Sequence, residues 1–385
     1  MNEVWRTYLN NANITNELHI SGAVDVLADG NIGAAADHTL YEINATSGAI
    51  IAAVNLPTGK NPPTDSAFNG FSAWPDGNLV LKSLNRPVGC TLNGYSSAAS
   101  RCPGAPASAN PSVLSVIDSK TWKVLGWVQG TENSIGRVSA SQYHGKDYAY
   151  FAGSTNIFRY VWDGKNITLD KTWGPVPYLK PGQTIAGALV IMGDWVMVST
   201  NGTPTKVPMT LLAISQANAT NIGRIDPVPL KPGQQSTYYA HGAADPDNNR
   251  FYVMDAGPHK AAAINVDPKT GKMSVAWIVP QWSQSYITLE GPANKRGFVN
   301  TNMSSSVTQN WSQLNYGPKG ANYVEQIQWR DAASGKLLAA SDFFPAAPAA
   351  TVPVGYGCLI YDLLNNGHIM ALQVLPASTA PSAKS

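Results

Sequence analysis

Four of the six histidines occupy matching positions in two similar segments, which makes them the first candidates for chemistry. His19 and His241 each stand at the start of a repeated unit, and His38 and His259 each lie in the loop after its second strand. Imidazole binds copper, iron or zinc. It also accepts and donates protons, because it titrates near neutral pH. The pattern indicates a transition-metal site or an acid–base site; the third possibility is that the four side chains share no function.

Acidic residues near these histidines extend the candidate site. Asp37 precedes His38, Asp255 lies four residues before His259, and Glu290 follows a short hydrophobic run. A carboxylate at such a position could complete a metal site or fix the tautomer of a metal-bound imidazole. We therefore predict Glu290 and the four histidines as catalytic residues, and the same four histidines as metal ligands.

A repeated β unit must position these residues, and it is clearest from His241 to Pro280. The segment reads as four short strands, with turn-forming residues at 246–249 and 267–272 and a break at Gly257 and Pro258. Such a unit is typical of a β-propeller blade. Similar turns recur along the chain, so the sequence predicts seven blades. The first six span 18–56, 71–128, 138–173, 187–225, 241–280 and 287–341.

The two ends of the chain complement each other. Residues 3–9 read as a strand with no unit before it, whereas residues 354–374 supply only part of a last blade. We expect the amino-terminal strand to complete that blade and close the ring, which leaves no free sheet edge between first and last blades. The predicted fold is therefore all-β: a seven-bladed β-propeller of four-stranded antiparallel blades. It forms one domain over 1–375, followed by a flexible tail over 376–385.

Blade topology assigns each candidate to one end of the ring. The connector into a first strand and the loop after the second strand share one end, here called the top end, and the other turns lie at the bottom end. All four histidines fall at the top end, with two long insertions at 85–111 and 303–322. His144 and His368 fall at the bottom end. The chemistry is therefore expected at the top end.

Further top-end residues are candidates for substrate binding. Cations there could bind a carboxylate, sulfate or phosphate group, and aromatic side chains suit a flat apolar ligand or a sugar ring. Another group of tryptophans, Trp122, Trp127, Trp277 and Trp329, is expected to pack between blades. The predicted substrate-binding residues are Arg86, Arg137, Lys206, Tyr238, Tyr239, Trp282, Tyr286, Trp311 and Tyr316.

The charge and cysteine content of the chain indicate which classes of partner and which cellular compartment to expect. Only 13% of residues are charged, the net charge is +2 and no block of Lys or Arg occurs, so nucleic acid is not an expected partner. No apolar run reaches transmembrane length. Cys90 and Cys102 bracket a polar loop and are expected to form a disulfide, rather than to be two of several metal thiolates. We expect an exported protein, periplasmic or extracellular, whose signal peptide is not part of this sequence.

Two outer turns carry a family resemblance. Residues 267–272, DPKTGK, and 331–336, DAASGK, each precede a hydrophobic strand. They resemble the D-x-x-T-G-K-x-x-W repeats of the quinoprotein-like (PQQ-like repeat) β-propeller superfamily. In dehydrogenases of that superfamily a vicinal disulfide holds pyrroloquinoline quinone. This chain has no adjacent cysteines, so that cofactor is not expected here.

These observations lead to one function and one alternative. We expect an exported enzyme that acts on a small aromatic or apolar molecule at the top end, using the histidines directly or through Cu, Fe or Zn. An oxidoreductase or lyase fits better than a hydrolase. The alternative is a propeller without catalysis that binds a glycan, a ligand or a protein, or that serves as a structural protein of the cell surface.

Overall fold

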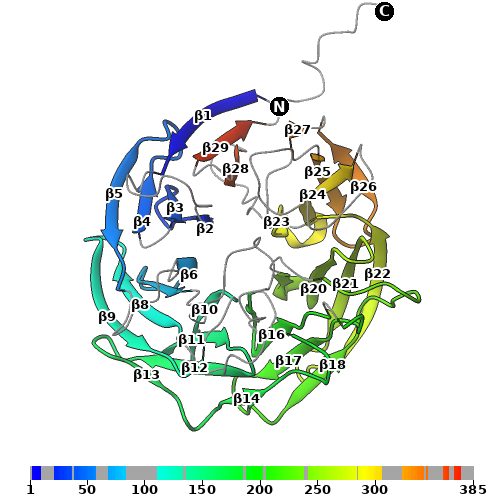
Figure 1. Ribbon diagram of the computed structural model, residues 1–385, viewed down its shortest axis with the longest axis horizontal. Helices are drawn as coiled ribbons and strands as arrows, with labels where there is room; N and C mark the ends of the chain where they lie inside the picture. Colours follow the sequence, from blue (N-terminus) through cyan, green and yellow to red (C-terminus); the bar gives the residue numbers. More distant parts are fainter. Residues whose placement is uncertain are drawn as a thin grey trace, which may run out of the picture.

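The computed structural model is a ring of seven antiparallel sheets arranged around a central axis (Figure 1). This confirms the predicted all-β, seven-bladed propeller. The structure describes residues 2–9, 21–36, 39–57, 68–83, 111–132, 136–184, 188–202, 205–237, 242–283, 285–305, 323–341, 344–345, 359–363 and 368–373.

In blades 1 to 4 the strands follow each other outward from the axis, each paired antiparallel with the next. Blade 3 adds β14 (Val176–Pro177), which pairs with β12 beside the four-strand path. Blade 1 contains β2 (Ser21–Val26), β3 (Ile32–Ala36), β4 (Thr39–Ile43) and β5 (Ile50–Asn55); blade 2 contains β6 (Phe68–Ala73), β7 (Leu79–Ser83), β8 (Val113–Asp118) and β9 (Lys123–Gln129). Blade 3 contains β10 (Val138–Tyr143), β11 (Lys146–Ala152), β12 (Asn156–Trp162) and β13 (Ile167–Leu169); blade 4 contains β15 (Val190–Met192), β16 (Trp195–Ser199), β17 (Leu211–Ser215) and β18 (Ile222–Ile225).

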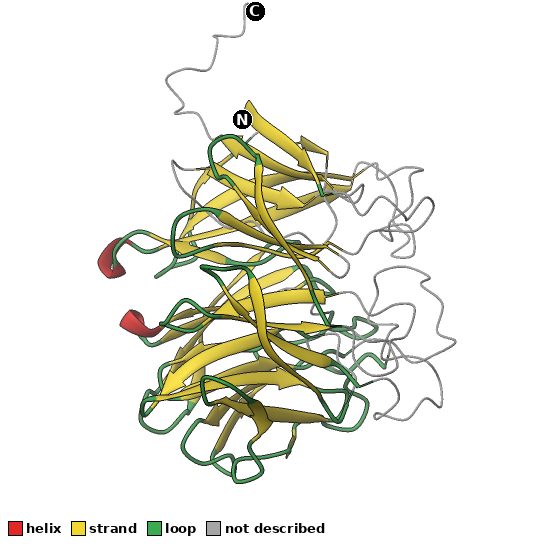
Figure 2. Cartoon of the chain, turned by 90° about the vertical axis from the view of Figure 1, so that its left-hand side faces the viewer, coloured by secondary structure: helices red, strands yellow, loops and turns green. Residues whose placement is uncertain are grey.

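Blades 5 and 6 share one extra feature, a 3-10 helix in the inner turn. Blade 5 contains β19 (Ala243–Asp245), η2 (Pro246–Asn248), β20 (Arg250–Asp255), β21 (Lys260–Val266) and β22 (Met273–Pro280). Blade 6 contains β23 (Thr288–Glu290), η3 (Ala293–Lys295), β24 (Gly297–Ser305), β25 (Tyr323–Asp331) and β26 (Leu337–Ala340), with β27 (Phe344–Pro345) beside β25. Both helices lie on the same side of the ring, the left in Figure 2, which marks the bottom end.

The amino-terminal strand joins the last blade, as expected. Blade 7 has three described strands, in the order β28 (Leu359–Leu363), β29 (His368–Gln373) and β1 (Asn2–Tyr8), and β1 pairs antiparallel with β29. The Trp5 indole of β1 donates to the carbonyl of Ala45 in blade 1 at 2.9 Å. Blade 7 is thereby linked to blade 1 by a strand from the opposite end of the chain.

Tryptophans join neighbouring blades at several further places. The Trp195 indole of blade 4 donates to the Pro268 carbonyl of blade 5 at 2.9 Å, and Trp277 of blade 5 donates to Ala332 of blade 6 at 3.1 Å. Between-blade packing is therefore confirmed for Trp277, whereas Trp127 is 42% exposed. A Cβ at Gly271, in the turn that accepts Trp195, would lie 2.5 Å from the indole ring. The small residue of this outer turn thus makes room for the neighbouring blade.

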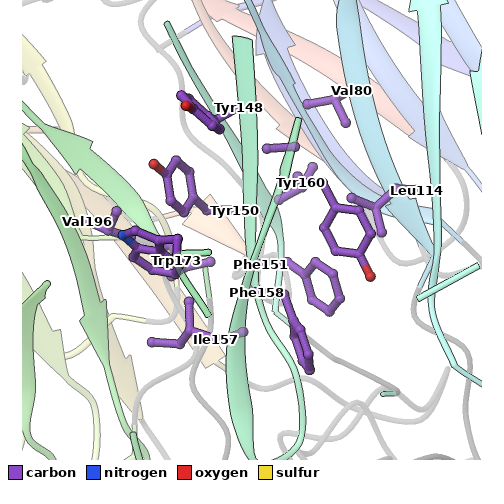
Figure 3. Packing of buried hydrophobic residues seen from close by; sticks show 14 of the residues in the cluster. Val80, Leu114, Tyr148, Tyr150, Phe151, Ile157, Phe158, Tyr160, Trp173 and Val196 are labelled. Carbon is purple, nitrogen blue, oxygen red and sulfur yellow. The ribbon is translucent and has the colours of Figure 1, made fainter. Parts of the chain in front are cut away.

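Aromatic packing is densest around blade 3. Tyr150, Phe151 and Tyr160 lie among Val80 and Leu114 of blade 2 and Val196 of blade 4 (Figure 3). Rigid contact between blades on both sides fixes the positions of the connectors at the top end. In the described part of the chain, no helix has the length and apolar character needed to cross a membrane.

Candidate functional site

Three of the four histidines predicted for the site lie outside the described residues. Their role as catalytic residues or metal ligands therefore stays a prediction. The described candidates are Arg137, Lys206, His259, Trp282, Tyr286 and Glu290. The candidates outside the described residues are His19, His38, His241, Arg86, Tyr238, Tyr239, Trp311, Tyr316, Cys90 and Cys102.

One connector at the top end holds two of the predicted aromatic residues. It links β22 to β23 through residues 281–283 and 285–287, and we call it the blade 5–6 connector. Its first part is hydrogen-bonded to β24. Gln281 Nε2 donates to the Thr301 carbonyl at 2.9 Å, and the Ser283 and Thr301 hydroxyls lie 2.7 Å apart. Main-chain bonds also join Trp282 to this strand, since Met303 N donates to the Trp282 carbonyl at 2.6 Å.

The second part of the connector is held by a buried amide. Asn300 Nδ2 donates to the Ser285 carbonyl at 3.0 Å, and Ser285 N donates to Ser283 Oγ at 3.0 Å. Asn300 is fully buried. Because several polar groups bind the connector along its length, the rings of Trp282 and Tyr286 are held in fixed positions.

His259 stacks on the first of these rings. The imidazole and indole centroids are 4.5 Å apart, with an angle of 14° between the ring planes. The main-chain N–H of Gln281 donates to the His259 carbonyl at 3.1 Å. His259 adopts a left-handed backbone with φ of 56°. Among the described residues, none bonds to either ring nitrogen. Burial lowers the pKa of His259, and the charge of Lys260 lowers it further. The imidazole is therefore neutral at pH 7 and can accept a proton.

Arg137 lies on the second ring. Its guanidinium carbon is 3.9 Å from the Tyr286 ring centroid. Arg137 precedes β10 of blade 3, and Tyr286 precedes β23 of blade 6. Blades 3 and 6 are not neighbours in the ring (Figure 1). This cation–π contact therefore crosses the axis near the top end and joins opposite sides of the propeller.

Neighbouring residues pack closely around the Arg137 side chain. A Cβ at Gly70 of β6 would lie 2.6 Å from Arg137 Cγ, so only glycine leaves room for this side chain. Loss of hydration raises the pKa of the Asp25 carboxyl on β2, while the hydrogen bond from Val26 N and the charge of Arg137 act against this rise. Arg137 itself is only 8% exposed.

Asp255 holds the top end of blade 5 together. Its carboxylate accepts hydrogen bonds from Ser236 Oγ at 2.6 Å, Thr237 N at 2.8 Å and Gly257 N at 3.1 Å. The side chain is completely buried, and burial raises its pKa to about 6, against the effect of these hydrogen bonds. The bonds from Ser236 and Thr237 join the connector into blade 5 to the loop that carries His259, and the bond from Gly257 lies within that loop. Asp255 is thus a positioning residue.

A buried lysine went unpredicted. Lys82, near the top of β7, has no exposed surface, and its Nζ donates to the Ser83 carbonyl at 2.7 Å. Burial holds its pKa well below the usual value of a lysine. The signal in the sequence is a lysine within the hydrophobic strand LVLKS. Lysines rarely occupy such positions unless the protein satisfies or uses the amine.

Two other predicted residues are separated from this group. Lys206 lies at the top end as expected, in the loop between β16 and β17, and is exposed. Glu290 ends β23 opposite Gly297, beside the inner turn with η3, and so lies toward the bottom end. The grouping of Glu290 with His259 is therefore corrected. The cause is the length of β23, which spans only Thr288–Glu290 and reaches the inner turn at once.

The metal hypothesis gains no support from the part of the chain that the structure describes. No three His, Cys, Asp or Glu side chains gather there as a ligand set. Because His19, His38 and His241 are not among the described residues, a metal site at the top end stays a prediction.

Comparison with known proteins shows similarity of fold alone. No known protein-family profile matches the chain, and no curated protein matches its sequence. The β-propeller domain of Cps50 (Swd1) from Myceliophteria thermophila is similar at 10% identity with a TM-score of 0.59, covering 94% of this chain and 99% of that domain. A chain in the structure of the Mitotic Checkpoint Complex is similar at 11% identity with a TM-score of 0.58, and the match covers 97% of this chain and 96% of that chain. BamB from Moraxella catarrhalis is similar at 12% identity with a TM-score of 0.52, and the match covers 97% of this chain and 99% of that chain.

These similarities support a propeller that spans nearly the whole chain. Identities this low carry no information on chemistry. The fold expected from the quinoprotein-like resemblance is confirmed, and membership of that superfamily stays a prediction.

Proposed function

We propose that the chain binds a small organic molecule at the top end of the propeller, beside the blade 5–6 connector. The observation that supports this best is that one connector holds two aromatic rings, each covered by a side chain able to bind or react. His259 lies on Trp282, and Arg137 lies on Tyr286. A few polar groups set among aromatic surfaces, on rigid elements, are typical of small-molecule sites.

The chemistry of the site follows from the state of each group. His259 is half-buried and neutral, so it can accept a hydrogen bond or a proton from a bound molecule. Arg137 keeps its charge at all physiological pH values. If the bound molecule reacts, His259 is the described residue suited to serve as the base. An oxidoreductase or lyase in an exported protein remains the enzyme class that we propose, with the other three histidines as further participants.

Nuclear magnetic resonance of histidine side chains tests this proposal. Protein with ring-labelled histidine is titrated with a library of small aromatic and aliphatic molecules. We expect some members to shift the His259 resonances and to leave those of His144, an exposed residue at the bottom end, unchanged. The His259→Ala variant should lose the response. A library that shifts no His259 resonance, or shifts both residues equally, would remove the proposed site.

A second function is favoured by a separate observation, the apolar outer strands. The large hydrophobic side chains that the described residues expose all lie on outermost strands, including Leu337 and Leu338 of β26 and Ile50 and Ile51 of β5. Exposed apolar patches often mark protein interfaces. A protein-binding propeller would use this circumference. Cross-linking with mass spectrometry in a native extract should then place partner cross-links near β5 and β26; cross-links confined to the top end would argue against it.

A further inference from the structure

We infer that Arg330 is a positioning residue for the candidate site, acting on the stack of His259 and Trp282 through Gln281. This inference rests on the proposed function, because it names a residue that holds the same site in place. It depends on two observations: the contacts of the Arg330 guanidinium and the hydrogen bonds that Gln281 makes in turn.

Arg330 lies at the junction of blades 5 and 6, near the end of β25, and is only 8% exposed. Its Nε donates to Gln281 Oε1, in the blade 5–6 connector, at 2.8 Å. Nη1 donates to the Gly335 carbonyl in the outer turn of blade 6 at 3.0 Å, and Nη2 donates to the Pro280 carbonyl at the end of β22 at 3.3 Å. Nη2 also donates to Gln328 Oε1 at 2.8 Å. One side chain thus holds the start of the connector against blade 6.

The charge of Arg330 makes this arrangement difficult to disturb. All four acceptors are neutral oxygens, and no carboxylate of the described residues forms an ion pair with Arg330. A guanidinium stays charged even though burial lowers its pKa. A buried charge is costly unless hydrogen bonds compensate it. Moving Gln281 away would remove one of these bonds, so the connector is held in one position.

Gln281 connects Arg330 to the stacked rings. Its main-chain N–H donates to the His259 carbonyl at 3.1 Å, and its Nε2 donates to the Thr301 carbonyl at 2.9 Å. The next residue, Trp282, stacks on the His259 imidazole with ring centroids 4.5 Å apart. Gln281 is buried. Its position therefore sets that of both rings, because one residue is bonded to its main chain and the other follows it directly.

Nuclear magnetic resonance of ring-labelled histidine tests this role in the free protein, at about pH 8.5, where the imidazole is neutral. The Trp282 ring should displace the resonances of the stacked His259 ring protons upfield. Arg330→Met keeps an unbranched apolar side chain of similar length but loses the hydrogen bonds, and we expect it to lose most of this displacement. Full retention of the displacement in folded Arg330→Met would overturn the inference.

Arg159→Met is the matched control. Arg159 is buried to nearly the same degree, 7% exposed, and its hydrogen bonds lie within blades 3 and 4. The variant should lose stability through the same kind of change and leave the His259 displacement as in the parent. An equal loss of displacement in Arg159→Met would show a general loosening of the ring and would also overturn the role of Arg330.

Gln281 provides a second test if Arg330→Met does not fold. Gln281→Glu keeps an acceptor for Arg330, whereas Gln281→Met removes it, and both variants lose the bond to Thr301. We expect the His259 displacement to persist in Gln281→Glu and to be lost in Gln281→Met. Equal values in the two variants would overturn the inference, because the bond from Arg330 would then not hold the stack.

Failure of this inference and failure of the proposed function are distinguishable. If Arg330→Met retains the displacement while small molecules of the library shift the parent His259, only the role of Arg330 is overturned. If Arg330→Met loses the displacement while the library shifts no His259 resonance in the parent, the proposed function is overturned, and the link from Arg330 to the stack stands.

Discussion

The guanidinium carbon of Arg137 lies 3.9 Å from the Tyr286 ring centroid, although the two residues belong to blades 3 and 6. This contact spans the axis and connects two blades that do not touch each other as neighbours. It also fixes the end of the blade 5–6 connector, whose other ring carries His259. The candidate site and the rigidity of the ring therefore depend on the same residues.

Two substitutions of Tyr286 should separate the contribution of its aromatic ring to stability from that of its hydroxyl. Tyr286→Phe keeps an aromatic face under Arg137, so we expect its free energy of unfolding to stay close to that of the parent protein. Tyr286→Leu removes the face and should cost about 1–2 kcal/mol. Urea unfolding of both variants provides the measurement. Equal losses in the two variants would show that the cation–π contact contributes nothing.

The pKa of His259 should depend on Trp282. Burial under the indole lowers it, so a lower value than the ordinary 6.5 is expected by NMR titration. Trp282→Leu opens the ring to water, and the His259 pKa should then rise toward 6.5. The resonances of His144, at the other end of the ring, serve as the internal control and should be the same in the parent and the variant. A His259 pKa that is unchanged in Trp282→Leu would contradict the role given to the stack.

Asp255 should make stability depend on pH. Its pKa is about 6 in the folded protein and about 3.9 when unfolded. The folded state therefore holds the proton more tightly, and this contribution is present below about pH 4 and is lost as pH rises through about 6. The loss amounts to about 3 kcal/mol.

Asp255→Asn removes this dependence while keeping the hydrogen bonds. An amide oxygen can accept from Thr237 N and Gly257 N, and the amide nitrogen can donate to Ser236 Oγ. Relative to the parent, the variant should gain stability between pH 4.5 and pH 7.5 in urea unfolding. A difference that stays constant over this range would show that the carboxyl is not the source.

Ring closure can be tested at one glycine. A methyl group at Gly48 would lie 2.7 Å from the Trp5 ring, and the residue also has φ of 74°. Gly30 has φ of 87° with nothing within 4 Å of an added methyl. Gly30→Ala therefore reports backbone strain alone, at about 1 kcal/mol. Gly48→Ala adds the clash with Trp5 and should cost at least about 1 kcal/mol more. Similar losses would mean that Trp5 does not hold β1 against blade 1.

The fold was predictable because its signals are local. Turn residues such as those at 267–272 recur in the outer hairpins of blades 1, 5 and 6. The glycine that these three turns share makes room for a tryptophan of the preceding blade, as Gly271 of blade 5 does for Trp195 of blade 4. The incomplete last blade could be paired with the amino-terminal strand by counting strands. These features need only neighbouring residues and the rules of sheet closure.

The site was less predictable because its contacts join distant blades. Arg137 and Tyr286 were both candidates, but their pairing depends on the distance across the ring, which spacing along the chain does not contain. Glu290 was assigned to the wrong group because β23 is short. Lys82 was missed because a lysine inside a strand suggests an exposed face, whereas β7 is buried along its full length.

Crystallographic fragment screening tests the central claim most directly, since it shows where small molecules bind without assuming a reaction. We predict bound fragments at the top end, in contact with His259 or Trp282. Fragments found only on the outer strands or at the bottom end, with the top end empty across the library, would contradict the account.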